Sequence, residues 1–225
     1  MEHGIPRSYY RVDIRDGRIE NVVPADGESL QYVLASEKQL MDLDTFCTHQ
    51  LHFSVFSVDS TFFNIGNYYV TNTCFENLRV VHASGKYKGR HPLEMGPTFV
   101  HTHRDENCIL DFFSALDRMI PNFRYQMQAI GSDGDEATMN AIASEKFKSH
   151  LIKAVTDQAQ LDGHFSNNRV ESTNNNVKDW VGRSGKVTLP VFNRKVEEYV
   201  TCQQQEFEMA IYANGPYDLA SHILI

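Results

Sequence analysis

Three acidic residues lie where a metal-dependent reaction could use them. Asp59 is near the end of a strand-like segment, Asp133 directly follows another, and Glu171 opens a helix-like segment. If the two strands are neighbours, both aspartates emerge at one edge of a sheet, where their carboxylates repel each other unless a divalent cation lies between them. Two Mg²⁺ ions about 4 Å apart activate water and stabilise the leaving oxygen of a phosphodiester. Asp59, Asp133 and Glu171 are therefore the candidate catalytic and metal-binding residues.

The same two aspartates could instead have structural roles, as turn or cap residues. A strand-end aspartate such as Asp59 is typical of a turn or cap, and Asp133-Gly134 is a common turn signal. His101 and His103 do not offer a second metal site, because residues two apart on a regular strand cannot chelate one ion without a bend. We expect them to be a loop histidine pair.

Other reaction classes have no sequence support. There is no GxSxG elbow, no Walker loop and no GxGxxG motif after a strand, which argues against hydrolase, kinase and dehydrogenase chemistry. The segment 86–91 mixes basic and aromatic residues, so it could contact a phosphate backbone, and a solvated hairpin tip is the alternative. Trp180, the one tryptophan, is expected in the core.

The segments around the acidic residues predict a mixed sheet with helices. We expect strands at 53–62, 68–71, 95–101 and 125–130, and helices at 109–120, 136–147, 170–181 and 190–213, whereas 37–50 shows only weak helical spacing within the N-terminal arm. The first three strands are joined so closely that they can only be antiparallel neighbours, because a parallel return needs a longer crossover. The strand–helix–strand unit that follows predicts the order 3-2-1-4, with strand four parallel to strand one.

Length and composition indicate how many domains the protein has and in which cellular compartment it is expected. The 225 residues, 41% of them hydrophobic, fit one domain with an appended arm, and we place the partly irregular arm at 1–50 and the domain at 51–225. A formal net charge of −8 argues against non-specific coating of nucleic acid. The lack of a long apolar run, of a secretory signal and of paired cysteines predicts an intracellular protein that does not enter membranes.

Several blocks together resemble the Mutator-like (MULE) transposase domain, in the form found in invertebrate genomes. The similar blocks are 56–71, 91–101, 128–137, 167–180 and the tail 190–219, so the resemblance covers roughly residues 50–220. It implies an α/β fold with an RNase H-like mixed sheet, in which an antiparallel three-strand meander is joined by a parallel strand, with flanking helices and a helical C-terminal tail. It also implies a DDE-type site in which Asp59, Asp133 and Glu171 bind Mg²⁺ or Mn²⁺.

The same resemblance implies a nuclear enzyme that cleaves transposon-end DNA and transfers strands. The sequence departs from the family pattern in one respect, and this departure favours an alternative to the enzyme. Family members carry a long helical insertion with a Cys–His motif between the second and third acidic blocks, whereas only 37 residues, none of them cysteine, separate Asp133 from Glu171 here. The alternative is a non-catalytic, transposase-derived protein that binds DNA or other proteins, or a decayed or mis-spliced copy. The sequence leaves the target DNA and a homo-oligomeric state open.

Overall fold

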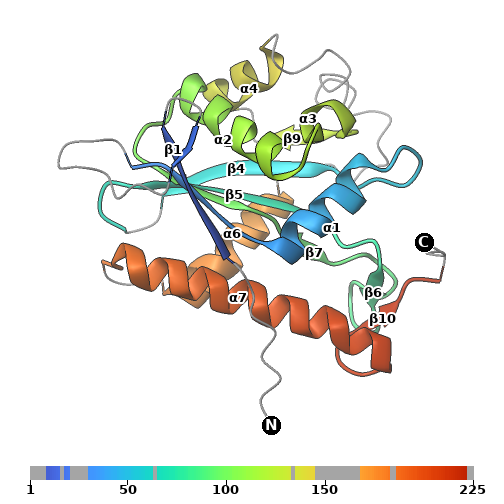
Figure 1. Ribbon diagram of the computed structural model, residues 1–225. Helices are drawn as coiled ribbons and strands as arrows, with labels where there is room; N and C mark the ends of the chain where they lie inside the picture. Colours follow the sequence, from blue (N-terminus) through green and yellow to red (C-terminus); the bar gives the residue numbers. More distant parts are fainter. Residues whose placement is uncertain are drawn as a thin grey trace.

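The computed structural model describes residues 9–15, 18–20, 30–62, 65–132, 135–144, 168–182 and 186–221. Its centre is an eight-stranded mixed sheet in the order β2-β1-β3-β8-β5-β4-β9, with β7 paired to β5 beside this path (Figure 1). The strands are β1 (Tyr9–Arg15), β2 (Arg18–Glu20), β3 (Tyr32–Ser36), β4 (Phe56–Phe62), β5 (Tyr69–Glu76), β6 (Val80–His82), β7 (Leu93–Met95), β8 (Thr98–His101), β9 (Ile130–Ser132) and β10 (Tyr217–Leu219). The helices are α1 (Glu37–Thr48), α2 (Glu106–Met119), α3 (Phe123–Gln126), α4 (Glu136–Ala143), α6 (Asn168–Val181) and α7 (Leu189–Met209), followed by a 3₁₀ turn at Ala210–Tyr212.

The four strands β8, β5, β4 and β9 have the order predicted from the sequence. β4 pairs antiparallel with β5, and β5 pairs antiparallel with β8. β9 pairs with β4 in parallel, with Phe56 opposite Ile130 and Val58 opposite Ser132. The order 3-2-1-4, the parallel fourth strand and the mixed α/β class, with flanking helices and a long C-terminal helix, are therefore confirmed.

The fourth strand begins later than predicted. Tyr125 and Gln126, expected as its first residues, lie in α3, and β9 contains only Ile130–Ser132. The cause is tertiary packing: the ring of Phe123 is buried edge-on against Phe56, with centroids 5.6 Å apart. A left-handed Asn122, with φ of 65°, turns the chain into this helix. Burial of an aromatic ring thus outweighs the alternating pattern that follows it.

Residues 30–48, expected within an N-terminal arm, are built into the sheet and its cover. β3 is buried along its whole length and pairs antiparallel with β8 and β1. Ser36 then caps α1, because its hydroxyl accepts from the backbone N–H of Gln39 while the Gln39 side chain accepts from the Ser36 N–H. This capping box fixes the change from strand to helix at one residue.

Helices cover the sheet on both faces, because its strands present apolar side chains alternately to each side (Figure 1). On one face, Val58 and Phe99 pack in a cluster to which α1, α2, α3 and α4 contribute. On the other face, Val70 and Val100 pack with α6 and α7, for example with Phe192. Asp59 follows Val58 on β4, so its side chain faces the layer formed by α6 and α7.

A second, two-stranded sheet lies at the C-terminal end of α7. β6 pairs antiparallel with β10, so the segment after β5 pairs with the C-terminal strand. Val80 of β6 packs there with Phe207, Ala210 and Tyr217. Across the described residues, no helix combines the length and the apolar character needed to cross a bilayer.

Candidate functional site

Asp59 is held at the end of a chain of buried hydrogen bonds. The Asn174 amide on α6 donates to Asp59 Oδ2 over 2.5 Å, and Asn174 Oδ1 accepts from the Asn72 amide over 2.7 Å. Asn72 Oδ1 accepts in turn from Thr98 Oγ1 over 3.2 Å. Asn72, Thr98 and Asn174 are nearly inaccessible to solvent, whereas Asp59 is half-buried. Three elements, β5, β8 and α6, therefore orient one carboxylate that still reaches solvent.

The helix α6 lies along β4 and brings Glu171 to the same side of the sheet. Lys178 Nζ donates to Thr61 Oγ1 over 2.7 Å, two residues beyond Asp59 on the same face of β4. Asn174 and Lys178, one helical turn apart on α6, thus contact Asp59 and Thr61, which are two residues apart on β4. Glu171 precedes Asn174 by three residues, so it lies on the same side of α6, one turn earlier and exposed.

Of the three predicted site residues, Asp59 and Glu171 are described and Asp133 lies outside the described residues. Asp59 and Glu171 lie on elements that contact each other, β4 and α6. Ser132, which precedes Asp133 in the sequence, pairs with Val58, which precedes Asp59. No group of three His, Cys, Asp or Glu side chains that could hold a metal occurs among the residues described, a set that lacks Asp133.

Two residues of this site, Asn72 and Asn174, are not among those predicted from the sequence. Asn72 lies directly opposite Asp59 in the β4–β5 pair. A signal for it exists, since an asparagine within a strand otherwise rich in β-branched and aromatic residues requires a hydrogen-bond partner when buried. Asn174 follows Glu171 by three residues, which places both on one side of a helix.

A second polar cluster lies in the core on the opposite face of the sheet. His101 Nε2 is 2.8 Å from Thr71 Oγ1, and its Nδ1 is 2.5 Å from the His103 carbonyl oxygen and 3.4 Å from Cys108 Sγ. Burial lowers the pKa of His101 to about 4 and raises the pKa of Cys108 to about 12. A neutral imidazole and a protonated thiol, both buried, form no activated nucleophile.

The two histidines therefore differ from the predicted loop pair. His101 ends β8 and its ring stacks on Phe99, with centroids 4.6 Å apart, so it is a core residue. His103 is exposed beyond the strand. The prediction for Trp180 is also wrong, because its side chain is 41% exposed and meets Tyr199 edge-on at 5.8 Å.

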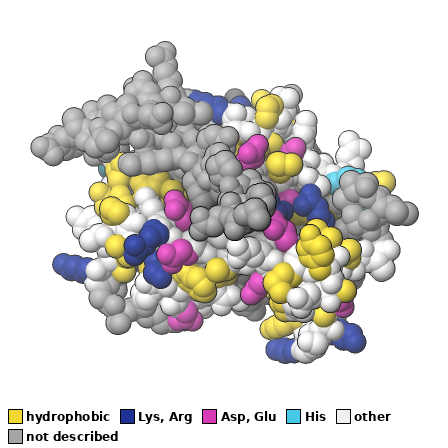
Figure 2. Space-filling view, turned by 60° about the horizontal axis from the view of Figure 1, so that its bottom comes forward, with side chains coloured by type: hydrophobic (Ala, Val, Ile, Leu, Met, Phe, Trp, Pro, Cys, Tyr) yellow, Lys and Arg dark blue, Asp and Glu magenta, His cyan; other side chains and the backbone are white. Residues whose placement is uncertain are grey.

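Charges on the face that carries α7 are mixed. Figure 2 shows acidic, basic and hydrophobic side chains interspersed there, without a continuous basic surface over the described part of that face. A duplex that lies along a protein needs clustered Lys and Arg. Any nucleic acid bound to this face would therefore meet scattered cations and not a broad basic stripe.

The chain was compared with family models, curated proteins and solved structures, and none of these comparisons found a match. What the structure establishes is a mixed α/β fold with one oriented carboxylate, Asp59, on the face covered by α6 and α7.

Proposed function

We propose that the chain is a metal-dependent DNA-cleaving and strand-transferring domain of the DDE type, related to Mutator-like transposases. The observation that carries this proposal is the register of β4 against β9. Val58 pairs with Ser132 in a parallel ladder, and in the sequence Asp59 follows Val58 and Asp133 follows Ser132. Asp59 does not lie at a strand end as predicted, since it is the fourth residue of β4 (Phe56–Phe62), but β9 ends at Ser132, level with Val58. A pair of metal-binding carboxylates needs neighbouring positions of this kind.

The arrangement of the sheet and helices supports the same proposal. Three antiparallel strands joined by a parallel fourth, with helices on both faces, are consistent with the RNase H-like fold that the sequence blocks imply. The helix with Glu171 crosses β4 on the Asp59 face, where a third carboxylate is expected. A likeness of fold alone does not imply an activity, so the acidic residues carry the functional argument.

The described donors fit a hard divalent cation. Asp59 supplies carboxylate oxygen, the preferred ligand of Mg²⁺ and Mn²⁺, and the hydrogen-bond chain described above joins it to amide and hydroxyl groups. Asp59, Asp133 and Glu171 would hold the ions, which supply an activated water and stabilisation of the leaving oxygen.

The protein's own contribution to the reaction would be orientation and charge. Asn174 fixes Asp59 Oδ2, so this carboxylate does not have to be ordered when a cation binds. Lys178, held on Thr61 of the same strand, adds a positive charge that would attract the phosphate of a DNA strand.

A non-catalytic, transposase-derived binding protein is the second candidate. The observation that favours it is the exposure of Glu171 together with the interspersed charges around α7 (Figure 2). In that case we still expect the protein to be in the nucleus and to bind DNA or another protein, but the acidic residues have only structural roles.

Titration of Mn²⁺ into the wild-type chain and its variants tests the proposal. Bound metal should raise the melting temperature, since a ligand at 100 times its Kd stabilises the folded state by about 2.7 kcal/mol. Asp59→Asn and Glu171→Gln should each lose most of this shift. Asp105→Asn is the matched control, because Asp105 caps α2 and asparagine caps helices equally well.

Three outcomes separate the candidates. Loss of the shift in both site variants, together with Mn²⁺-dependent nicking of supercoiled plasmid by the wild type alone, supports the enzyme. A shift that depends on Asp59 but is accompanied by no nicking supports the non-catalytic protein. Equal shifts in the wild type and all three variants would mean that Asp59 and Glu171 have only structural roles, and the metal-site proposal should be abandoned.

A further inference from the structure

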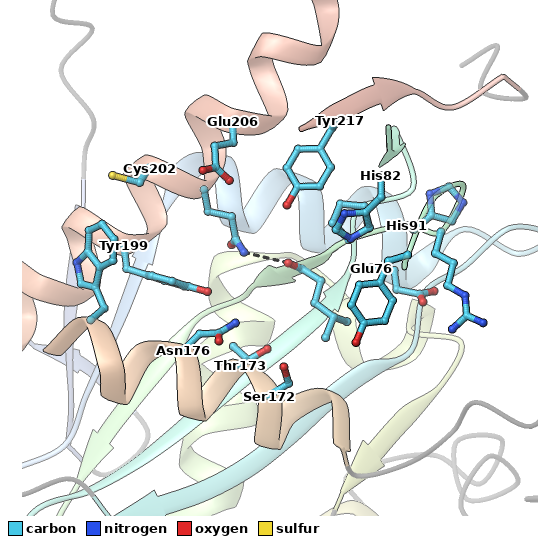
Figure 3. Close-up of a pocket in the computed structure, with 16 residues that line it drawn as sticks. Glu76, His82, His91, Ser172, Thr173, Asn176, Tyr199, Cys202, Glu206 and Tyr217 are labelled. Atoms are coloured by element: carbon cyan, nitrogen blue, oxygen red, sulfur yellow. Dashed lines mark hydrogen bonds between the residues drawn. The ribbon is translucent and has the colours of Figure 1, made fainter. Parts of the chain in front are cut away.

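A pocket of about 650 Å³ lies between α6, α7 and the small β6–β10 sheet (Figure 3). Its volume is within the range of roughly 300–1,000 Å³ that is usual for small-molecule sites. The pocket does not use Asp59, and an inference from it is independent of the function proposed above.

Aromatic rings form much of the wall of this pocket. Trp180 of α6 and Tyr199 of α7 meet edge-on with ring centroids 5.8 Å apart, and His82 and Tyr217 lie 5.0 Å apart on the β6–β10 side. Figure 3 shows the hydroxyl ends of Tyr199 and Tyr217 directed towards the space between the elements. Ring faces of this kind attract cations.

One carboxylate on the α7 side has no cationic partner among the residues that the structure describes. Glu206 lines the pocket from the last turn of α7, and that turn contains no basic residue. No described residue forms an ion pair with Glu206. The C-terminal end of a helix carries partial negative charge, so the carboxylate adds to a potential that is already negative. This end of the pocket therefore favours a positively charged group.

The neighbouring groups cannot supply that charge themselves. Burial, and then the negative charge of Glu206, raise the pKa of Tyr217 to about 12, so its hydroxyl stays neutral. Burial likewise lowers the pKa of His82, which keeps the ring uncharged near neutral pH. On the strand side, Arg90 and Glu76 contribute one charge of each sign. Glu206 is thus the uncompensated charge of the lining.

The remaining polar lining suits a ligand with several N–H donors. Ser172 and Asn176 of α6 present side-chain oxygens. Gln203 is held in place, because its Oε1 accepts from the Met95 N–H over 2.8 Å and its Nε2 donates to the Leu93 carbonyl over 2.9 Å. A rigid wall with oxygen acceptors favours a planar, multiple donor over a single ammonium.

We propose that this pocket binds the guanidinium group of arginine, stacked on the aromatic wall and paired with Glu206. The guanidinium is planar, stacks on aromatic faces and matches a carboxylate with two parallel hydrogen bonds, whereas an ammonium is a strongly hydrated point charge. The group could come from free arginine, to whose carboxylate Arg90 would donate, or from an arginine within a polypeptide.

Trp180 provides a direct reporter, because it is the one tryptophan of the chain and lines the pocket. The full chain is titrated with free L-arginine and with a capped Gly-Arg-Gly peptide while tryptophan fluorescence is recorded. The matched ligands contain citrulline, which keeps the shape of arginine and lacks its charge. We expect at least one arginine ligand to change the fluorescence, and its citrulline counterpart to bind about tenfold more weakly.

Two variants on one helix locate the site. Glu206→Gln should weaken arginine binding about tenfold, the loss of one charge-assisted pair. Glu208→Gln, also exposed in the last turn of α7 but outside the lining, should bind as the wild type does. Both positions are exposed, so folding is preserved, and the unliganded spectrum of Trp180 checks this.

Comparison of the ligands and of the two glutamate variants tests the proposal. Binding of the peptide alone identifies a polypeptide source, and binding of free arginine alone identifies a metabolite, either of which supports the proposal. Equal binding of arginine and citrulline ligands, no binding by either arginine ligand, or equal weakening by the two glutamate variants would overturn it.

Discussion

Replacement of Glu94 by glutamine is expected to stabilise the protein at neutral pH. Glu94 on β7 is fully buried beside Asp42 of α1, whose oxygens accept from Lys38 Nζ at 2.5 Å and Arg79 Nη1 at 2.6 Å. Asn77 Nδ2 donates to Glu94 Oε2 over 2.7 Å, whereas Glu94 Oε1 has no hydrogen-bond partner among the described residues. Burial, and then the negative charge of Asp42, hold the pKa of Glu94 well above its ordinary value.

The sign of the pH effect follows from this raised pKa. A protonated Glu94 can donate to Asp42, an interaction that two ionised carboxylates cannot make. The folded state therefore retains a proton that the unfolded chain releases above its ordinary pKa of 4.5. The free energy of unfolding must fall as the pH rises from this value towards the raised pKa.

The size of the effect comes from Glu94 Oε1, which is left without a partner beside Asp42 once Glu94 loses its proton. A buried polar atom without a hydrogen bond costs about 1–3 kcal/mol. In Glu94→Gln the amide stays neutral at every pH, its oxygen accepts from Asn77 and its N–H groups donate to Asp42. We therefore expect the variant to gain about 1–3 kcal/mol at pH 8, which corresponds to roughly 2–4 °C in Tm per kcal/mol for a domain of this size.

Urea unfolding followed by circular dichroism at pH 5 and pH 8 measures this effect. The gain of Glu94→Gln over the wild type should be larger at pH 8 than at pH 5, and Glu208→Gln, on the exposed side of α7, should change neither value. A variant that loses stability at both pH values would show that Glu94 is ionised and stabilised by Lys38 and Arg79, contrary to our reasoning.

Two further predictions concern the other face of the core and a helix cap. Because burial lowers the pKa of His101 to about 4 from an ordinary 6.5, the wild type should lose stability as the pH falls through this interval. His101→Gln should reduce that loss in urea unfolding, and an unchanged pH profile would contradict the assignment. Asp105 accepts from the Cys108 N–H over 2.9 Å, so Asp105→Ala should cost about 1 kcal/mol while Asp105→Asn costs little; equal losses in thermal unfolding would count against the cap.

The central sheet could be predicted because its signals are local. Alternation around Val58 and the short connections between strands dictate antiparallel neighbours, and the helix between the third and fourth strands permits the parallel return. β3 gave no such signal, since Tyr32–Ser36 is a short run in a polar, turn-rich region and becomes a strand by pairing with β8, more than sixty residues later. Non-local pairing of this kind leaves no pattern in the segment itself.

The candidate site was predictable in its residue types and less so in its geometry. Asp59 could be placed on one face of β4 from the alternation of its neighbours. The roles of Asn72 and Asn174 depend on how α6 lies across the sheet, which no spacing encodes. The prediction for Trp180 is wrong for a related reason, because its exposure depends on how α6 packs against α7, which helical spacing does not encode.

The two edges of the large sheet affect whether copies of the chain can associate at high concentration. The strands at its edges, β2 and β9, have three residues each, whereas β4 and β5, with seven and eight residues, are interior strands. An edge strand offers unpaired backbone groups on which another molecule can add a strand, and short edges offer few of them. Beside these edges, β2 covers only Asp13–Arg15 of β1, and β9 covers only Phe56–Val58 of β4. The rest of each longer strand lies beside no described strand on that side, so strand-by-strand association between copies of the chain would have to begin at these short stretches.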